Sequence, residues 1–158
     1  MGAAEPRRSI AQNRRARHDY EVLERLEAGI ALVGPEVKSL RAGKANLTDA
    51  YAVVVGGDAI LKNLHISPYP HAARENPEPR RDRRLLLHRR EIVRLAGKVA
   101  ERGLTLVPLS LYWKDGRAKV ELALVRGRRQ YDKRQAIRKR EEDRELRGRL
   151  ARRGRGGR

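Results

Sequence analysis

The last fifth of this 158-residue chain is too charged and too poor in apolar residues to fold by itself. Residues 127–158 hold 14 Lys and Arg against five Asp and Glu, which is half of the net charge of +18. Their aliphatic side chains are limited to Ala136, Ile137, Leu146, Leu150 and Ala151. So few apolar groups cannot offset the entropy lost on ordering. We therefore expect a folded domain over 13–126, a flexible N-terminus over 1–12, and a basic tail over 127–158 that is disordered in isolation.

Several classes of chemistry have no support in the residue pattern. The chain has no Cys, which excludes disulfides and thiolate sites. Its four His have no metal-ligand spacing, no Ser lies in a nucleophile elbow, and no Gly-rich segment matches a phosphate loop. The apolar stretches fall short of the roughly 18–20 residues that span a bilayer. We expect a cytoplasmic protein with no catalytic residue, no metal, no cofactor and no membrane partner.

The charge favours a polyanionic partner, with nucleic acid first and an anionic membrane surface second. Basic side chains cluster at 14–18, at 38–44, at 80–84 and at the start of the tail. Contacts with phosphates explain such clusters without any reading of base sequence. Tyr131 is different, because an aromatic ring among cations can stack on a base for roughly 1–3 kcal/mol. A ribosomal protein, a general RNA chaperone and, less readily, an RNA-processing enzyme remain as alternatives.

Hydrophobic periodicity predicts a small antiparallel barrel. Helical spacing of Ile92, Leu95 and Val99 predicts a helix over 89–102. Two hairpins are expected, at 104–113 with 118–124 and at 51–55 with 59–66, as well as a short helix over 35–41 and a proline-rich surface loop over 68–84. The segment 20–32 is ambiguous between helix and strand, since its pattern alternates while its residues favour helix. Closing the sheet would protect its edges.

Five blocks in fixed order resemble the SsrA-binding protein (small protein B) family. The blocks are 13–30 (NRRARHDY followed by EAGI), 36–51 (EVKSLRAGKANLTDAY), 84–88 (RLLLH), 109–114 (LSLYWK) and 127–134 (GRRQYDKR). The resemblance covers about 10–150. It implies a mainly β protein, a closed antiparallel OB-type barrel with about three helices, and it favours a strand at 20–32.

The resemblance also implies a function. Members of this bacterial family bind the tRNA-like domain of transfer-messenger RNA and bring it to stalled ribosomes for trans-translation. The barrel mimics part of a tRNA, and the tail becomes helical in the empty mRNA channel next to the small-subunit decoding centre. Such a protein is not an enzyme. It reaches alanyl-tRNA synthetase and elongation factor Tu indirectly through the RNA, and we expect a monomer.

Residue roles follow only where the motifs match. Asn13, Glu27 and Leu86 match positions tied to the RNA elbow. Charge adds further expected contacts to the tRNA-like domain: Arg14, Arg15, Arg17, Lys38, Arg41 and Lys44. The expected ribosome-binding residues of the tail are Gly127, Tyr131, Asp132, Lys133, Arg134, Ile137, Arg138 and Lys139. Tyr131 stands where some relatives have His, and both rings are flat enough to stack on a base.

Overall fold

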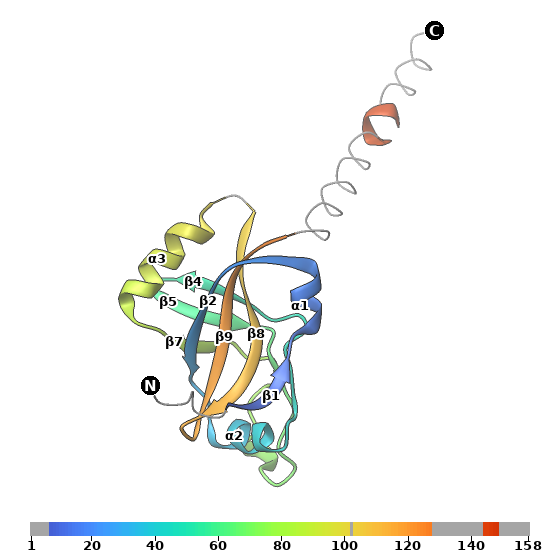
Figure 1. Ribbon diagram of the computed structural model, residues 1–158. Helices are drawn as coiled ribbons and strands as arrows, with labels where there is room; N and C mark the ends of the chain where they lie inside the picture. The colour runs from blue at the N-terminus through green and yellow to red at the C-terminus, as the bar shows by residue number, and fades with distance from the viewer. Residues whose placement is uncertain (1–6, 102, 128–143, 149–158) are drawn as a thin grey trace.

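The computed structural model describes residues 7–101, 103–127 and 144–148 (Figure 1). The strands are β1 (Arg8–Gln12), β2 (Tyr20–Ile30), β3 (Ala45–Asn46), β4 (Tyr51–Val55), β5 (Asp58–Lys62), β6 (His65–Ile66), β7 (Arg83–Leu86), β8 (Leu104–Lys114) and β9 (Arg117–Gly127). The helices are α1 (Arg14–Asp19), α2 (Gly34–Arg41) and α3 (Arg89–Val99), with a 3₁₀ turn η1 (Ala73–Glu75).

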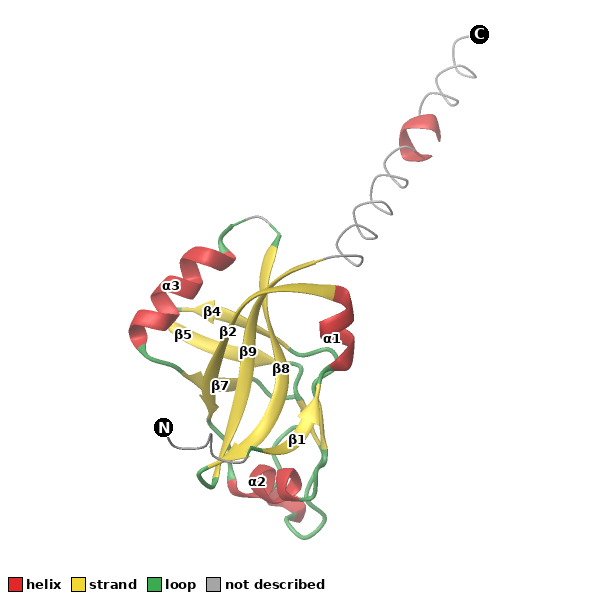
Figure 2. Cartoon of the chain, viewed as in Figure 1, coloured by secondary structure: helices red, strands yellow, loops and turns green. Residues whose placement is uncertain are grey.

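The sheet closes on itself as an antiparallel barrel. Its strand order is β1-β8-β4-β5-β7-β2-β9, and β9 pairs again with β8. β1 and β4 share one edge of β8, and β3 with β6 forms a separate two-stranded sheet. Figure 2 shows α2 at one end of the barrel and α3 toward the other end. The expected mainly β barrel with about three helices is confirmed.

The long β8–β9 hairpin confirms the one expected at 104–113 with 118–124. Its turn places Asp115 at φ 53° and Gly116 at φ 72°, which is the positive-φ pair of a type I′ turn. The pairing register shifts between Pro108 and Ser110, which marks an irregularity such as a bulge. A proline lacks the N–H that a regular ladder needs, so this shift is where the chain tolerates it.

The core is aliphatic, as the composition requires. Leu61, Leu85, Leu106, Leu111 and Leu122 are almost fully buried inside the barrel. α3 adds Ile92 and Leu95 to this core, whereas Val93 on its opposite face is exposed. A second cluster joins Ala16 of α1 to Val107, Leu109, Ala123 and Val125. β8 is therefore buried on both faces over most of its length, which explains its nearly continuous apolar sequence, whereas β9 is buried on both faces only from Leu122 to Val125.

The structure corrects three expectations and confirms the strand that the resemblance favours within 20–32. The N-terminal boundary is earlier than residue 13, because Arg8–Gln12 form β1 with Ile10 and Ala11 packed on the core. The ambiguous segment 20–32 is mainly β2, which ends at Ile30. The strand expected over 59–66 is split at Asn63, whose φ of 62° breaks the extended backbone. The loop expected over 68–84 ends earlier, because Arg83 begins β7.

The tail prediction lies mostly outside the described residues. Gly127 ends β9, opposite Tyr20 of β2. Residues 144–148 are helical, with Leu146 exposed. Across 7–101, 103–127 and 144–148, no helix has the length and apolarity needed to cross a membrane.

Candidate nucleic-acid interface

Asn13 fixes a short basic helix against the barrel. Its Oδ1 accepts a hydrogen bond from the Ala16 N–H (3.1 Å), which caps α1. Its Nδ2 donates to the carbonyls of Leu47 (3.1 Å) and Pro108 (2.9 Å). The side chain is buried, and its three hydrogen-bond partners all belong to the protein. The expected RNA contact of Asn13 stays a prediction, and the geometry makes it a residue that positions α1.

Three arginines project from α1 into solvent. Arg14, Arg15 and Arg17 are all exposed, while Ala16 on the inner side is buried. Arg15 forms an ion pair with Asp19 (3.4 Å), and one Arg17 guanidinium nitrogen donates to Gln12 Oε1 (3.4 Å). Exposed pairs of this kind contribute little to stability, so the guanidinium groups can exchange these partners for phosphates.

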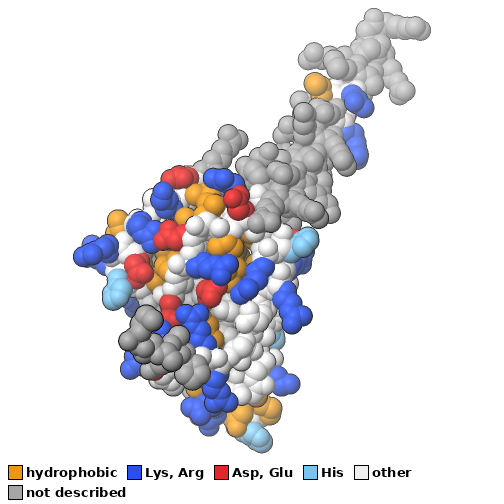
Figure 3. Space-filling view, viewed as in Figure 1, with side chains coloured by type: hydrophobic (Ala, Val, Ile, Leu, Met, Phe, Trp, Pro, Cys, Tyr) orange, Lys and Arg blue, Asp and Glu red, His pale blue; other side chains and the backbone are white. Residues whose placement is uncertain are grey.

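A second basic group lies on and after α2. Lys38, Arg41 and Lys44 are all exposed. The hydroxyl of Ser39 donates to the Ser67 carbonyl (2.6 Å), which ties the helix to the following loop. Gly43 (φ 71°) ends the helix. Figure 3 shows Lys and Arg at this end of the molecule, whereas acidic side chains gather toward α3.

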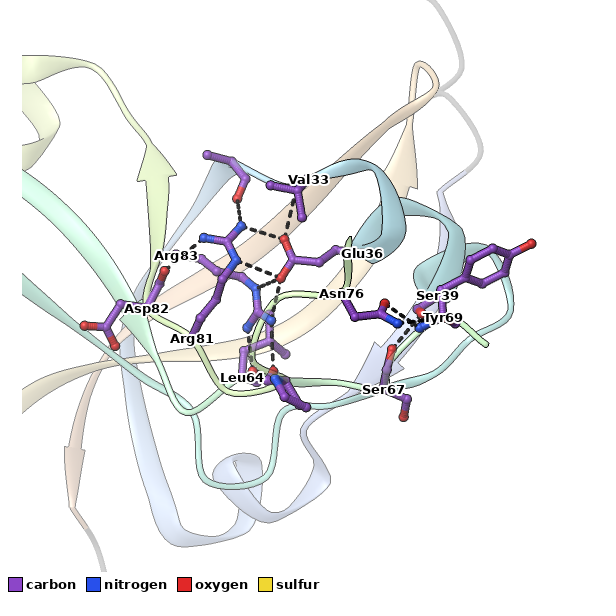
Figure 4. A network of polar contacts seen from close by, with 12 residues as sticks. Val33, Glu36, Ser39, Leu64, Ser67, Tyr69, Asn76, Arg81, Asp82 and Arg83 are labelled. Atoms are coloured by element: carbon purple, nitrogen blue, oxygen red, sulfur yellow. Dashed lines mark hydrogen bonds and ion pairs between the residues drawn. The ribbon is translucent and has the colours of Figure 1, made fainter. Parts of the chain in front are cut away.

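Part of the arginine run at 80–84 points inward, contrary to the expected crown of phosphate contacts. Figure 4 shows Arg81 and Arg83 converging on the carboxylate of Glu36, the α2 residue that also accepts from the Val33 N–H (3.0 Å). The ion-pair distances are 2.5 Å from Arg81 and 2.6 Å from Arg83. Arg83 also donates to the carbonyls of Leu64 and Pro79. This network joins α2 to β7 and to the loop before it. Its charges therefore stabilise the fold and are not available for phosphates.

The pKa of Glu36 is lowered although the group is buried. Burial alone would raise this pKa, but hydrogen bonds from Arg81, the Val33 N–H and Arg83 outweigh it. The carboxylate is therefore charged at neutral pH and offsets the buried Arg83. The sequence offered no direct sign of this pairing, since Glu36 and Arg83 are far apart in the chain.

Glu27 on β2 is held by donors on its outer face. The Tyr112 hydroxyl donates to it (2.5 Å), and Lys114 lies at 3.4 Å and Arg7 at 3.8 Å. The Tyr112 hydrogen bond is the largest cause that lowers the pKa of Glu27. Burial and the neighbouring Glu27 raise the pKa of Tyr112. Glu27 is thus an ordered acceptor whose charge is balanced by nearby cations.

Leu86 shares a face with Glu27. It lies directly opposite Gly29 on the neighbouring strand, and alternate residues of β2 point to the same side. Its side chain is 52% exposed although it is apolar. A Cβ added at Gly29 would come within 3.0 Å of the Leu86 Cβ, so the glycine leaves the space that Leu86 occupies. Two of the three elbow residues expected from the resemblance, Glu27 and Leu86, therefore share one sheet face.

The expected site residues fall into three surface groups. The groups lie on α1, at α2 and on the β2–β7 face, and Gly127 lies at the end of β9. Tyr131, Asp132, Lys133, Arg134, Ile137, Arg138 and Lys139 lie outside the described residues. Sequence reasoning missed aromatic partners of the cations: Lys38 lies over the ring of Tyr69 (5.3 Å) and Arg41 over that of Trp113 (5.9 Å). The single tryptophan of the sequence was the available signal.

The family model of the SmpB protein matches residues 10–152. The chain belongs to the SmpB family. It is 57% identical over 144 residues to the SsrA-binding protein of Desulforudis audaxviator, with 91% of this chain and 94% of the relative covered. It is 56% identical to that of Acidothermus cellulolyticus, with 99% and 98% covered.

A solved structure agrees with this assignment. A chain described under "tmRNA-SmpB: a journey to the center of the bacterial ribosome" has a TM-score of 0.65 and 54% identity to this one. The similarity covers 81% of this chain and 94% of the other. At this identity the shared fold and the shared family agree.

Proposed function

We propose that the barrel binds the tRNA-like domain of transfer-messenger RNA and that the protein brings this RNA to stalled ribosomes for trans-translation. The observation that carries the proposal is α1, a capped helix that presents three exposed arginines in a chain of the SmpB family. The names of the relatives and of the solved tmRNA–SmpB structure support the identity of the RNA.

The barrel contacts RNA through shape and phosphates, as is usual for structured RNA. Arg14, Arg15 and Arg17 bind backbone phosphates, and Asn13 acts by positioning their helix. Lys38, Arg41 and Lys44 extend the contact at the α2 end. On the third face, Leu86 packs against a ribose or base, and the ordered Glu27 carboxylate accepts hydrogen bonds from hydroxyl or amino groups. Glu27 cannot contact a phosphate favourably, which limits how the RNA can lie there.

The tail supplies the ribosomal contact in this proposal. Its charge favours the mRNA channel, and an mRNA already in the channel excludes it through sterics and charge. The tail therefore distinguishes ribosomes with an empty mRNA channel from ribosomes whose channel holds mRNA. Tyr131 stacks on a base at the decoding centre, and Asp132, Lys133, Arg134, Ile137, Arg138 and Lys139 continue the contact into the channel. Gly127 joins the two functions at the end of β9.

The proposal includes no catalytic step by this protein. Within the described ranges, no group of three or more metal-binding side chains is present. The protein acts as a monomer in the cytoplasm, where its RNA partner is charged by alanyl-tRNA synthetase and carried by elongation factor Tu. Both partners are reached through the RNA.

Matched variants test the division of labour. Truncation after Gly127 keeps binding to the tRNA-like domain, as measured by mobility shift, and abolishes tagging on stalled ribosomes in a reconstituted translation assay. The double variant Arg14→Gln/Arg17→Gln lowers RNA affinity and reduces the slope of affinity against salt by about two. Arg89→Gln/Arg90→Gln on α3 removes the same charge and serves as the control. Loss of RNA binding on truncation, or an equal loss in both double variants, would contradict the proposal.

The alternatives give different results. A ribosomal protein co-purifies with ribosomes in high salt at fixed stoichiometry, and a general RNA chaperone binds unrelated structured RNAs with equal affinity. An RNA-processing enzyme cleaves its RNA in a magnesium-dependent reaction. Selective binding of the tRNA-like domain without cleavage favours the proposed function.

A further inference from the structure

The end of the barrel next to α2 contains a cavity, and Arg41 is its only lining residue among the proposed RNA contacts. Its volume is about 410 Å³, within the range of roughly 300–1,000 Å³ that is typical of ligand pockets. It is lined by Arg8, Arg41, Trp113, Asp115 and Gly116. These residues come from four elements: the start of β1, the last residue of α2, the end of β8 and the hairpin turn after it.

The register of the sheet explains why an arginine and the tryptophan meet here. Arg8 of β1 lies directly opposite Trp113 of β8, so the two side chains are on the same side of the sheet. Arg41 reaches the ring from α2, with its guanidinium carbon 5.9 Å from the ring centroid. That distance is near the outer limit of about 6 Å for a cation–π contact, so the exposed Arg41 is held loosely.

The two arginines of the cavity differ in their ion pairs from the neighbouring Arg7. No acidic side chain in the described ranges forms an ion pair with Arg8 or Arg41, whereas the adjacent Arg7 pairs with Glu27 and Glu121. Asp115 is exposed at the turn and also lines the cavity. The cavity therefore combines an aromatic face, one carboxylate and two guanidinium groups that form no ion pair with a described residue. These groups suit the base, the amino group and the phosphates of a nucleotide.

We propose that Trp113, Arg8 and Arg41 form a stacking subsite for one unpaired nucleotide of the bound RNA. The base stacks on the Trp113 ring after Arg41 moves aside, the two guanidinium groups hold the flanking phosphates, and the Asp115 carboxylate accepts from a base amino group. This inference rests on the proposed RNA-binding function and adds a base contact at the end of the barrel, away from α1 and the β2–β7 face.

The single tryptophan of the sequence makes the test site-specific. The full chain is titrated with the tRNA-like domain of transfer-messenger RNA while Trp113 emission and a mobility shift are recorded on the same samples. Stacking predicts that emission is quenched along the binding curve and that the ring becomes protected from acrylamide. Complete binding with unchanged emission and unchanged acrylamide access would overturn the subsite and leave the proposed function intact. Absence of any binding would overturn both.

Substitutions give an independent readout. Trp113→Leu keeps an apolar side chain against the core and removes the stacking face, and it weakens RNA binding by about 5- to 150-fold, the range expected for one stacked base. Trp113→Phe retains a ring and weakens binding less. Arg8→Gln and Arg41→Gln each reduce the salt slope by about one, whereas Arg89→Gln on α3 is the charge control. Equal affinity of Trp113→Leu and the unmodified chain would refute the proposal, and the quenching experiment decides the matter if that variant does not fold.

Discussion

Replacing Glu36 by Gln removes the carboxylate that forms ion pairs with Arg81 and Arg83. The Glu36 side chain is 3% exposed, and that of Arg83 is fully buried. Gln has nearly the same shape, so the change tests charge rather than packing. Breaking a buried pair by removing one partner costs about 3–5 kcal/mol, because the remaining charge is left without compensation. Arg81 is partly exposed and can turn to solvent, which places the expected loss in the lower part of that range.

Urea unfolding of the full chain, followed by circular dichroism, measures this loss. With a slope of about 1–3 kcal/mol/M, a loss of about 3 kcal/mol lowers the midpoint by roughly 1–3 M. The matched control is Glu24→Gln, which breaks the exposed pair with Arg94 on α3. That change should cost at most about 1 kcal/mol. Equal losses in the two variants, or a loss below about 1 kcal/mol for Glu36→Gln, would refute the reasoning.

The pH dependence of the same network has a definite sign. The pKa of Glu36 is lowered in the folded state, so its contribution is present above the unfolded pKa and is lost as pH falls through the folded pKa. The stability difference between the unmodified chain and Glu36→Gln should therefore be constant near neutral pH and shrink in acid. A difference that grows in acid would contradict the assigned charge state.

Variants of Asn13, Gly29 and Tyr112 test the candidate interface further. Asn13→Ala should cost at least about 2 kcal/mol in urea unfolding, because it removes a helix cap and two buried hydrogen bonds. Asn13→Asp keeps the cap but sets a carboxylate oxygen against the carbonyls of Leu47 and Pro108, so it should cost at least as much as Asn13→Ala, and a smaller cost would contradict these two hydrogen bonds. Gly29→Ala should cost about 1–3 kcal/mol by crowding the Leu86 Cβ, and adding Leu86→Gly, which removes that Cβ, should restore part of the loss; an additive double variant would contradict the contact. Tyr112→Phe should raise the pKa of Glu27 toward its ordinary value in an NMR titration, and an unchanged titration would show that the hydroxyl is not the main cause.

Hydrophobic periodicity and turn residues were sufficient to predict the elements that neighbouring residues define. The alternation around Val120 and Leu122 and the turn at Asp115-Gly116 gave the β8–β9 hairpin, and the spacing of Ile92 and Leu95 gave α3. The resemblance to the family, rather than periodicity, resolved β2. β1 was missed because its five residues are too few for a period and are ordered by pairing with β8.

Contacts between distant residues could not be predicted in the same way. Arg83 looked like part of an exposed basic run, and its burial depends on Glu36 and on two carbonyls elsewhere in the chain. Asn13 looked like an RNA contact, and the two hydrogen bonds that its Nδ2 donates form only when β8 and the loop at Leu47 are in place. The arginines of α1 are exposed without depending on distant partners, and their contact with RNA stays a prediction.

Crosslinking in cells tests the central claim most directly. The full chain is expressed in bacteria, crosslinked to RNA by ultraviolet light, purified under denaturing conditions, and the attached RNA is sequenced. We predict that transfer-messenger RNA dominates, with crosslinks concentrated in its tRNA-like domain, and that Arg14→Gln/Arg17→Gln reduces them more than Arg89→Gln/Arg90→Gln. Crosslinks spread over cellular RNAs in proportion to their abundance, and equally reduced in both variants, would contradict the account.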